Sequence, residues 1–221
     1  MDQHIAALEQ AGIRVNDALK RQEDEDTLRR EHILHWTGLI EDYEERVGRY
    51  PFVGEEGSKF ANRVLVATPE QERLRTEDNR TDTRFNDIEF ADFVAELERG
   101  LDRQILPKFD PATDSTQAPM HYSYYSSADK DYVFIVTCKS CGATEISTLL
   151  MFEPNLPTLN IASKSMVPKV TKARTRDSMM SHNLWKTWDS YGFHDEAAAR
   201  LRERTMIEEA GFGDRLPPAP R

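Results

Sequence analysis

The sequence has no apolar run long enough to cross a membrane, and it has only two cysteines in 221 residues. A membrane-spanning helix needs about 20 apolar residues, and small secreted folds depend on several disulfides. Cys138 and Cys141 stand three positions apart and cannot staple such a fold, and the first residues lack the features of a signal peptide. We therefore expect a soluble protein of the reducing cytoplasm, without a membrane partner.

The sequence also lacks the short motifs that mark common catalytic sites. It contains no GxSxG nucleophile elbow, no HExxH zinc helix, no P-loop and no GxGxxG nucleotide fingerprint. These absences make an enzyme a weaker hypothesis without excluding it. We therefore predict no catalytic residues and keep the enzyme hypothesis as an alternative.

Negative charge is in excess, because 39 acidic residues face 29 basic ones and the net charge is −10. The imbalance lies in the first half, where residues 1–60 carry 14 acids against 8 bases and residues 61–110 carry 12 against 8. An acidic surface repels nucleic acid and attracts basic partners. The alternative interpretation is that the acidity only keeps the protein in solution.

Two strand-like runs flank the cysteines in the stretch from Tyr132 to Phe152. Both runs are rich in β-branched, aromatic and aliphatic residues, and Gly142 supplies the positive φ that a tight turn requires. This pattern predicts a buried β-hairpin around which the rest of the chain is organised.

The turn Cys138-Lys-Ser-Cys141-Gly has the form of a zinc knuckle. A structural zinc needs four ligands, so the missing ones would come from a histidine such as His121 or from the same turn of a second chain. A redox motif is another reading, although such motifs usually connect a strand to a helix. The third interpretation is an inert structural turn. The predicted cofactor is therefore zinc if the turn binds metal, and none otherwise.

Apolar residues recur three or four apart in residues 2–22 and again in residues 28–47, which is typical of amphipathic helices. The acidic run that begins at Glu23 lies between them and suits the positive end of a helix dipole. We therefore predict a pair of helices as an N-terminal unit, residues 1–48. Gly48 fits the residue that follows the second helix.

The rest of the chain combines short strand-like segments with helix-like ones. We expect strands at 63–68, at 120–126, in the hairpin and at 158–161, helices at 88–105, 183–193 and 194–210, and a polar loop after a short helical turn in 69–86. This order predicts an α+β fold with a mainly antiparallel sheet, packed by helices and extended by helices at both ends. Residues 49–163 form the predicted α+β core, and residues 164–221 add a basic loop and the C-terminal helices to it.

Two groups of side chains are candidates for binding a protein partner. They are Glu41, Asp42, Glu44 and Glu45 on the acidic side of the second helix, and Tyr122, Tyr124 and Trp185 in two aromatic clusters. Large amphipathic aromatic residues anchor many interfaces, but they also fill ordinary cores. Both interpretations of the aromatic clusters stay open at the level of the sequence.

His32 and His35 lie three residues apart on the second helix and could share a metal with Glu31 or Glu41. His32 also falls within the apolar spacing of that helix. A packed histidine is therefore the prediction for His32.

Four stretches together resemble a pattern found in uncharacterised bacterial proteins. They are WTGLIEDYEERVGRYPFV from Trp36, NRVLVATPEQ from Asn62, FVAELERGLDRQILPKFDP from Phe93 and YVFIV from Tyr132. The resemblance spans residues 34–162 and associates the chain with accessory or immunity proteins of bacterial toxin systems. It assigns no functional residue. The acidic N-terminus, the polar stretch 73–84 and the C-terminal extension depart from the pattern, which leaves any shared partner open.

These observations predict a non-catalytic protein-binding module, such as an immunity protein that inhibits a basic toxin. The acidic side of the second helix would then mimic phosphates or block a basic cleft. One alternative is a zinc-binding protein or enzyme organised by the CxxCG hairpin. Another is a structural subunit of a larger complex, with the N-terminal helices as its contact.

Overall fold

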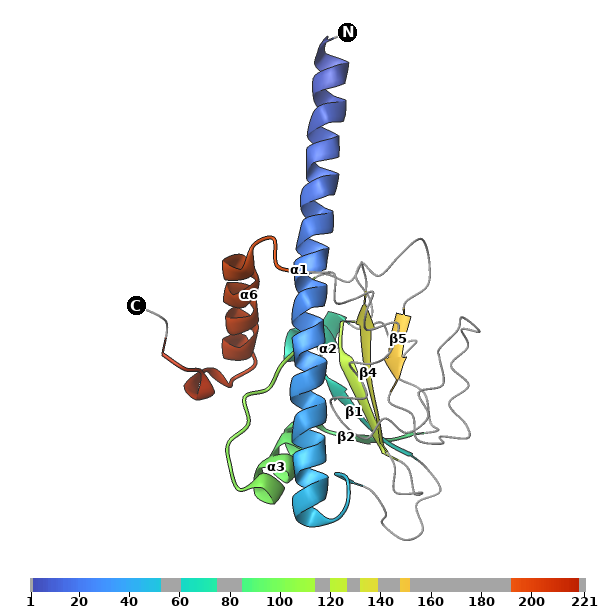
Figure 1. Ribbon diagram of the computed structural model, residues 1–221, viewed down its shortest axis with the longest axis vertical. Helices are drawn as coiled ribbons and strands as arrows, with labels where there is room; N and C mark the ends of the chain where they lie inside the picture. Colours follow the sequence, from blue (N-terminus) through green and yellow to red (C-terminus); the bar gives the residue numbers. More distant parts are fainter. Residues whose placement is uncertain are drawn as a thin grey trace.

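The computed structural model describes residues 2–52, 61–74, 85–113, 120–126, 132–138, 148–151 and 192–218. Its longest element is helix α1 (Asp2–Val47), which lies between a β-sheet and helix α6 (Glu196–Glu209), with helix α3 (Phe90–Leu101) near its C-terminal end (Figure 1). A short helix, α2 (Pro69–Leu74), and a 3-10 turn, η3 (Gly213–Arg215), complete the helical elements of the described chain. The N-terminal part of α1 extends well beyond every other labelled element (Figure 1).

α1 is one continuous helix of 46 residues, so the predicted pair of N-terminal helices is wrong. The acidic run that indicated a new helix start instead binds groups inside the fold. Asp24 accepts hydrogen bonds from the backbone N–H groups of His194 and Asp195. Asp26 accepts one from Arg29 at 2.6 Å. Because no proline or glycine interrupts this run, and Asp24 and Asp26 have hydrogen-bond partners, the helix continues through it.

The C-terminus of α1 forms where the sequence predicts it. Gly48 has a φ of 81°, and its N–H donates to the carbonyl of Glu44 at 2.8 Å, which is the αL ending that glycine favours. The chain then turns at Phe52, whose carbonyl accepts hydrogen bonds from the side chains of Asn62 and Ser126 at 2.6 and 3.1 Å. These bonds hold the end of the helix against the sheet.

The described strands form one sheet in the order β2-β1-β3-β4-β5. Their bounds are Ala61–Val66 (β1), Phe85–Ile88 (β2), Tyr122–Ser126 (β3), Tyr132–Cys138 (β4) and Thr148–Met151 (β5). β1 and β2 are parallel and the other three neighbouring pairs are antiparallel, which confirms the predicted α+β fold with a mainly antiparallel sheet. β4 and β5 pair as the predicted hairpin requires, with Cys138 opposite Thr148, but they lie at one end of the strand order.

β2 is a strand that the sequence pattern did not predict. The polar stretch 69–86 begins with a short helix, as expected, but its last residues belong to β2. Polar contacts connect β2 to β1, because Arg63 forms a two-point ion pair with Asp87 at 2.6 and 2.8 Å and Asn86 donates to Asn62 at 2.8 Å. Such pairs replace the apolar alternation by which strands are usually recognised.

One hydrophobic core fills the space between the sheet and the helices. The fully buried Trp36 ring of α1 lies 6.0 Å from Phe93 of α3 and 6.1 Å from Phe134 of β4, measured between ring centroids. The second half of α1 therefore shares its core with the sheet and is not a separate unit. Core members include Ile33, Leu39, Ile40 and Tyr43 of α1, Leu97 and Leu101 of α3, and Val64, Val66, Tyr122, Tyr124 and Val136 of the sheet.

The helices α3 and α6 form within the ranges predicted for them. The side chain of Asp195 caps α6 by accepting the N–H of Ala198 at 3.0 Å, and Gly211 follows the helix with a φ of 85°. The predicted strand at 158–161, the basic loop after residue 164 and most of the predicted helix at 183–193 lie outside the described residues.

Gly100→Ala is expected to destabilise the protein, although alanine favours helices more than glycine does. Gly100 of α3 lies against the Tyr43 ring of α1, and a Cβ at this position would overlap two ring carbons. Overpacking costs about 1–3 kcal/mol, whereas helix propensity returns about 1 kcal/mol. Chemical denaturation followed by circular dichroism measures the net loss. The control is Ala95→Gly on the exposed side of α3, which measures the effect of helix propensity without a change in packing. A Gly100→Ala protein that is more stable than wild type would contradict the close packing.

Candidate functional site

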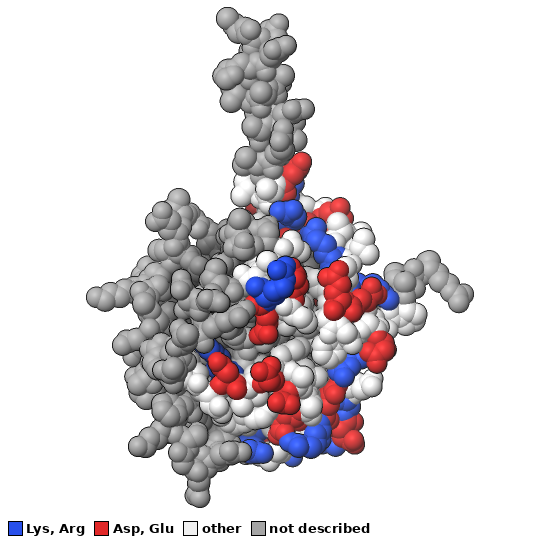
Figure 2. Space-filling view, turned by 180° about the vertical axis from the view of Figure 1, so that it is seen from behind, with Lys and Arg blue, Asp and Glu red and all other residues white. Residues whose placement is uncertain are grey.

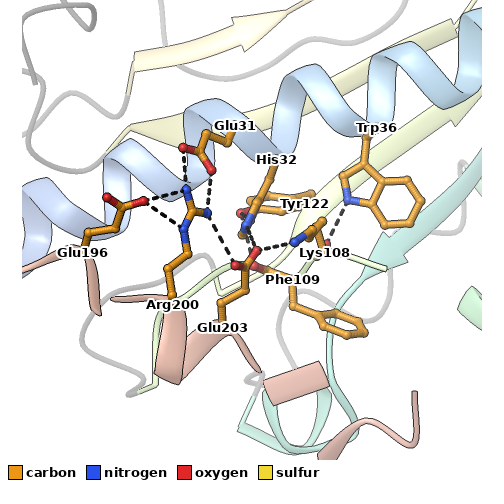
Figure 3. Close-up of polar contacts among 9 residues, drawn as sticks. All are labelled: Glu31, His32, Trp36, Lys108, Phe109, Tyr122, Glu196, Arg200 and Glu203. Carbon is orange, nitrogen blue, oxygen red and sulfur yellow. Dashed lines mark hydrogen bonds and ion pairs between the residues drawn. The ribbon is translucent and has the colours of Figure 1, made fainter. Parts of the chain in front are cut away.

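A network of polar side chains, buried at its centre and partly exposed at its edge, joins α1, α6, β3 and the segment between α3 and β3 (Figure 3). At its centre is His32 of α1, which is 1% exposed. His32 Nδ1 lies 2.8 Å from Tyr122 Oη of β3, and its Nε2 lies 2.7 Å from Glu203 Oε1 of α6. The prediction that His32 is a packed histidine is therefore confirmed.

Two basic side chains hold the Glu203 carboxylate in this network (Figure 3). Lys108 Nζ donates to Oε1 at 2.7 Å, and Arg200 Nη1 lies 3.5 Å from Oε2. Arg200 also forms a two-point ion pair with Glu31 of α1, at 2.6 and 2.8 Å. The indole N–H of Trp36 donates to the Lys108 carbonyl at 2.8 Å. α6 is thus fastened to the core largely through charged groups.

Burial and hydrogen bonding fix the protonation states of the network. Burial lowers the pKa of His32, so the imidazole is neutral at neutral pH although Glu203 opposes the shift. Burial alone would raise the pKa of Glu203, but hydrogen bonds from His32 and Lys108 outweigh it and hold that pKa well below its ordinary value. Nε2 therefore carries the proton and donates to Glu203, and Nδ1 accepts the proton of Tyr122.

The order of tyrosine, histidine and carboxylate resembles the nucleophile, base and orienting group of some catalytic triads. Tyr122 and His32 are 0% and 1% exposed, however, so a substrate cannot reach them. Burial also raises the pKa of Tyr122 well above its usual value, which works against an activated phenolate. The arrangement is therefore a structural clamp between α1 and α6.

A second buried cluster surrounds Arg29, which is fully buried on α1. Its Nε and Nη2 donate to the Asp110 carboxylate at 3.1 and 2.9 Å, and its Nη1 donates to Asp26 at 2.6 Å. Burial opposes the charge, but Asp110 raises the pKa of Arg29 above its usual value. Asp110 also accepts the N–H of Ala112 at 2.9 Å, and its carbonyl accepts the Gln71 side chain of α2 at 2.6 Å. This cluster fixes the segment between α3 and β3 against α1.

Tyr122 and Tyr124 are not surface anchors, so this part of the predicted partner-binding site is wrong. Both side chains are 0% exposed, and Tyr124 Oη donates to the Pro51 carbonyl at 2.7 Å. The strand pattern could not decide between core and surface, because tyrosines occur on both sides of β3. Trp185, the third aromatic candidate, lies outside the described residues.

The four acidic candidates stand on the last turns of α1. Asp42 and Glu45 are exposed, and Glu41 and Glu44 are half-buried. Asp42 pairs with Arg103 at 2.8 Å, and an open groove of about 380 Å³ is lined by Asp42, Glu45, Arg46, Leu101 and Arg103. Figure 2 likewise shows acidic and basic residues intermixed on one face of the molecule. The surface at the end of α1 therefore carries mixed charge.

The residues proposed for zinc are only partly described. Ser123 pairs with Ile135 in the antiparallel β3–β4 pair, so His121 and Cys138 belong to the same end of these two strands. Cys141 lies outside the described residues. Within the described part of the chain, no group of three or more histidine, cysteine or acidic residues is arranged to hold a metal. Zinc binding by the CxxCG turn stays a prediction.

Apart from Glu31, the charged residues of the two networks were not singled out from the sequence, although one signal was present. Arg29 lies four residues before Ile33, on an apolar position of its helix, and Glu203 lies between the buried Ala199 and Met206 of α6. A charge at an apolar helix position indicates a buried ion pair. The partners could not be found in this way, because His32 and Glu203 are 171 positions apart.

Comparison of the chain with protein-family models, with curated proteins and with solved structures finds no match. Within the described residues, no helix is long and apolar enough to cross a membrane. The resemblance to accessory proteins of toxin systems therefore stays a prediction.

Arg29→Met is expected to destabilise the protein by about 3–5 kcal/mol, because it leaves the buried Asp110 charge without its partner. Adding Asp110→Asn to the same variant should recover part of this loss, since it removes the unpaired charge. Urea denaturation measures both effects. Arg73→Met is the control, because it breaks a two-point pair with Glu70 that is exposed on both sides and should leave stability unchanged. Equal losses in both single variants would contradict the role of burial.

Stability is expected to fall on mild acidification. The pKa of His32 is lower in the folded protein than the value of about 6.5 in the unfolded chain. The neutral His32 therefore contributes its full stabilisation above about pH 6.5, and this stabilisation is lost as the pH falls below that value. The loss reaches about 1.4 kcal/mol per pH unit for such a histidine. Unfolding free energies measured at about pH 7.5 and about pH 5.5 test this dependence.

His32→Gln should make that pH dependence shallower. The remaining slope should come partly from His35, whose pKa burial lowers to about 4 and which acts in the same direction. Glu203 affects the pH dependence of stability only below about pH 4.5, because its pKa in the folded protein is lowered from that value. It therefore does not change the slope between the two pH values measured. An unchanged slope in His32→Gln would show that His32 takes up no proton on unfolding.

Proposed function

We propose that the chain is a non-catalytic, cytoplasmic protein-binding module whose contact is the projecting segment, residues 2–22 of α1. The body, defined as the described residues from Glu23 onward, holds that segment away from itself. The observation that carries the proposal is the extension of α1 beyond all other labelled elements (Figure 1). The cytoplasmic location is supported only by the cysteine usage of the sequence.

The contacts of α1 with other described elements support this assignment. Its first hydrogen bonds to another described element are at Glu23 and Asp24, both to His194. Leu19, inside the projecting segment, is 50% exposed. Leu8 and Val15 precede it at helical spacing, which places the three positions on one side of the helix.

Such a segment is expected to need a partner. Most helical stability in proteins comes from packing of an apolar side, and short isolated helices are marginal in water. Gly12 within the segment reduces the intrinsic helix stability by about 1 kcal/mol relative to alanine. A protein that packs against the apolar side supplies the missing stabilisation, as in other complexes in which a helix provides the recognition surface.

Inhibition of a basic toxin is a second, narrower candidate function. The net charge of −10 and the groove beside Asp42 and Glu45 favour it, and Glu41 and Glu44 lie on the same helix end. The pairing of Asp42 with Arg103 weakens the attraction of this surface for a basic protein. The projecting segment is therefore the better supported contact.

A variant that carries Leu8→Glu and Leu19→Glu is expected to lose the protein partner. Two charges on the apolar side of the segment oppose helix packing without touching the body. Native mass spectrometry of the protein isolated gently from its own cells should show a further polypeptide on the wild-type chain and none on this variant.

The matched control is Gln3→Glu with Gln10→Glu, which adds the same charge on the opposite side of the helix. It should keep the partner. A wild-type chain without any further polypeptide would refute the proposal. A complex that survives in both variants but dissociates steeply with added salt would instead assign the contact to the acidic end of α1.

A further inference from the structure

The projecting segment differs in charge from the rest of the chain. It contains three acidic and three basic residues, so the whole net charge of −10 lies outside it. Two bodies therefore repel each other, whereas two projecting segments do not. Among the residues whose side chains the structure describes, which in this segment begin at Asp17, the exposed large hydrophobic ones are Leu19, Val47 and Leu201, and Leu19 belongs to the neutral segment. Two copies of the chain can thus meet here at the lowest electrostatic cost.

We propose that the partner of the projecting segment is a second copy of this chain, with the two segments side by side and antiparallel. Positions 8, 15 and 19 are seven and four residues apart, which is compatible with the heptad spacing of paired helices. In antiparallel register, Leu8 of one copy is level with Leu19 of the second, and Gly12 is level with Val15. This register places a leucine position level with a leucine position at each end and a glycine position near the middle.

The antiparallel direction follows from where the bodies lie. A parallel pair would place two bodies next to each other, each attached at the same end and each carrying the excess negative charge. An antiparallel pair places them at opposite ends of the paired segments. Twenty-one residues of helix separate them by about 30 Å at about 1.5 Å per residue. This distance is several times the Debye length of about 8 Å, so the charges of the two bodies are screened from each other.

This inference rests on the proposed function, because it identifies the protein partner of the same segment. Its test uses the purified full chain alone, so it is independent of any other polypeptide. Size-exclusion chromatography with light scattering should give twice the chain mass of 25.5 kDa. Leu8→Glu with Leu19→Glu should halve this mass, and Gln3→Glu with Gln10→Glu should leave it doubled.

Small-angle X-ray scattering of the same samples tests the direction. Two separated bodies should give a pair-distance distribution with two maxima, and the disrupted variant should lose the second maximum. A dimer with a single compact maximum would overturn the antiparallel arrangement. Denaturation curves of the variants should match wild type measured at high dilution, which shows that the body still folds.

The remaining outcomes separate the two proposals. A wild-type chain that is monomeric at all concentrations overturns self-pairing, but the proposed function stands if native complexes contain a different polypeptide that Leu8→Glu with Leu19→Glu removes. A dimer that persists in this variant also overturns self-pairing through the segment, and the proposed function then stands or falls with the same native-complex measurement.

Discussion

The buried ion pair between Arg29 and Asp110 is the contact on which the arrangement of the body depends. A guanidinium without exposure to water requires carboxylates at hydrogen-bonding distance, and Asp26 and Asp110 provide them. Asp110 lies in the segment that also carries Lys108 and Phe109. Fixing this segment against α1 brings Lys108 next to Glu203 and so determines where α6 lies. One charge pair thereby positions three separate parts of the chain.

The two halves of α1 serve different purposes. The second half is buried among the sheet, α3 and α6, and it carries both apolar side chains and the polar ones that bind α6. The first half makes no described hydrogen bond to another element before Glu23. Both belong to one continuous helix, so the partner proposed for the first half would be held at a fixed orientation to the body. In that role the helix would space the partner from the body as well as join them.

Local patterns were sufficient for the elements whose causes are local. The end of α1 at Gly48, the spacing of α3 and the antiparallel partners of β4 all follow from residues close in sequence. The sequence pattern did not predict β2, because its pairing depends on polar contacts with β1 rather than on apolar alternation. The sequence pattern did not predict the continuity of α1, because the groups that bind Asp24 lie 170 and 171 positions away. Glu203 likewise could not be predicted as the partner of His32, because the two residues are 171 positions apart.

These long separations also set the order in which the molecule can assemble. α1 precedes residues 194–203 in the chain, so the groups of these residues that bind Asp24, Glu31 and His32 are synthesised after it. Contacts between such distant residues form slowly, because a large loop must close before they contribute. The projecting segment contains its whole apolar pattern within 21 consecutive residues. The pairing proposed for this segment therefore depends on none of the long-range contacts that hold the body together.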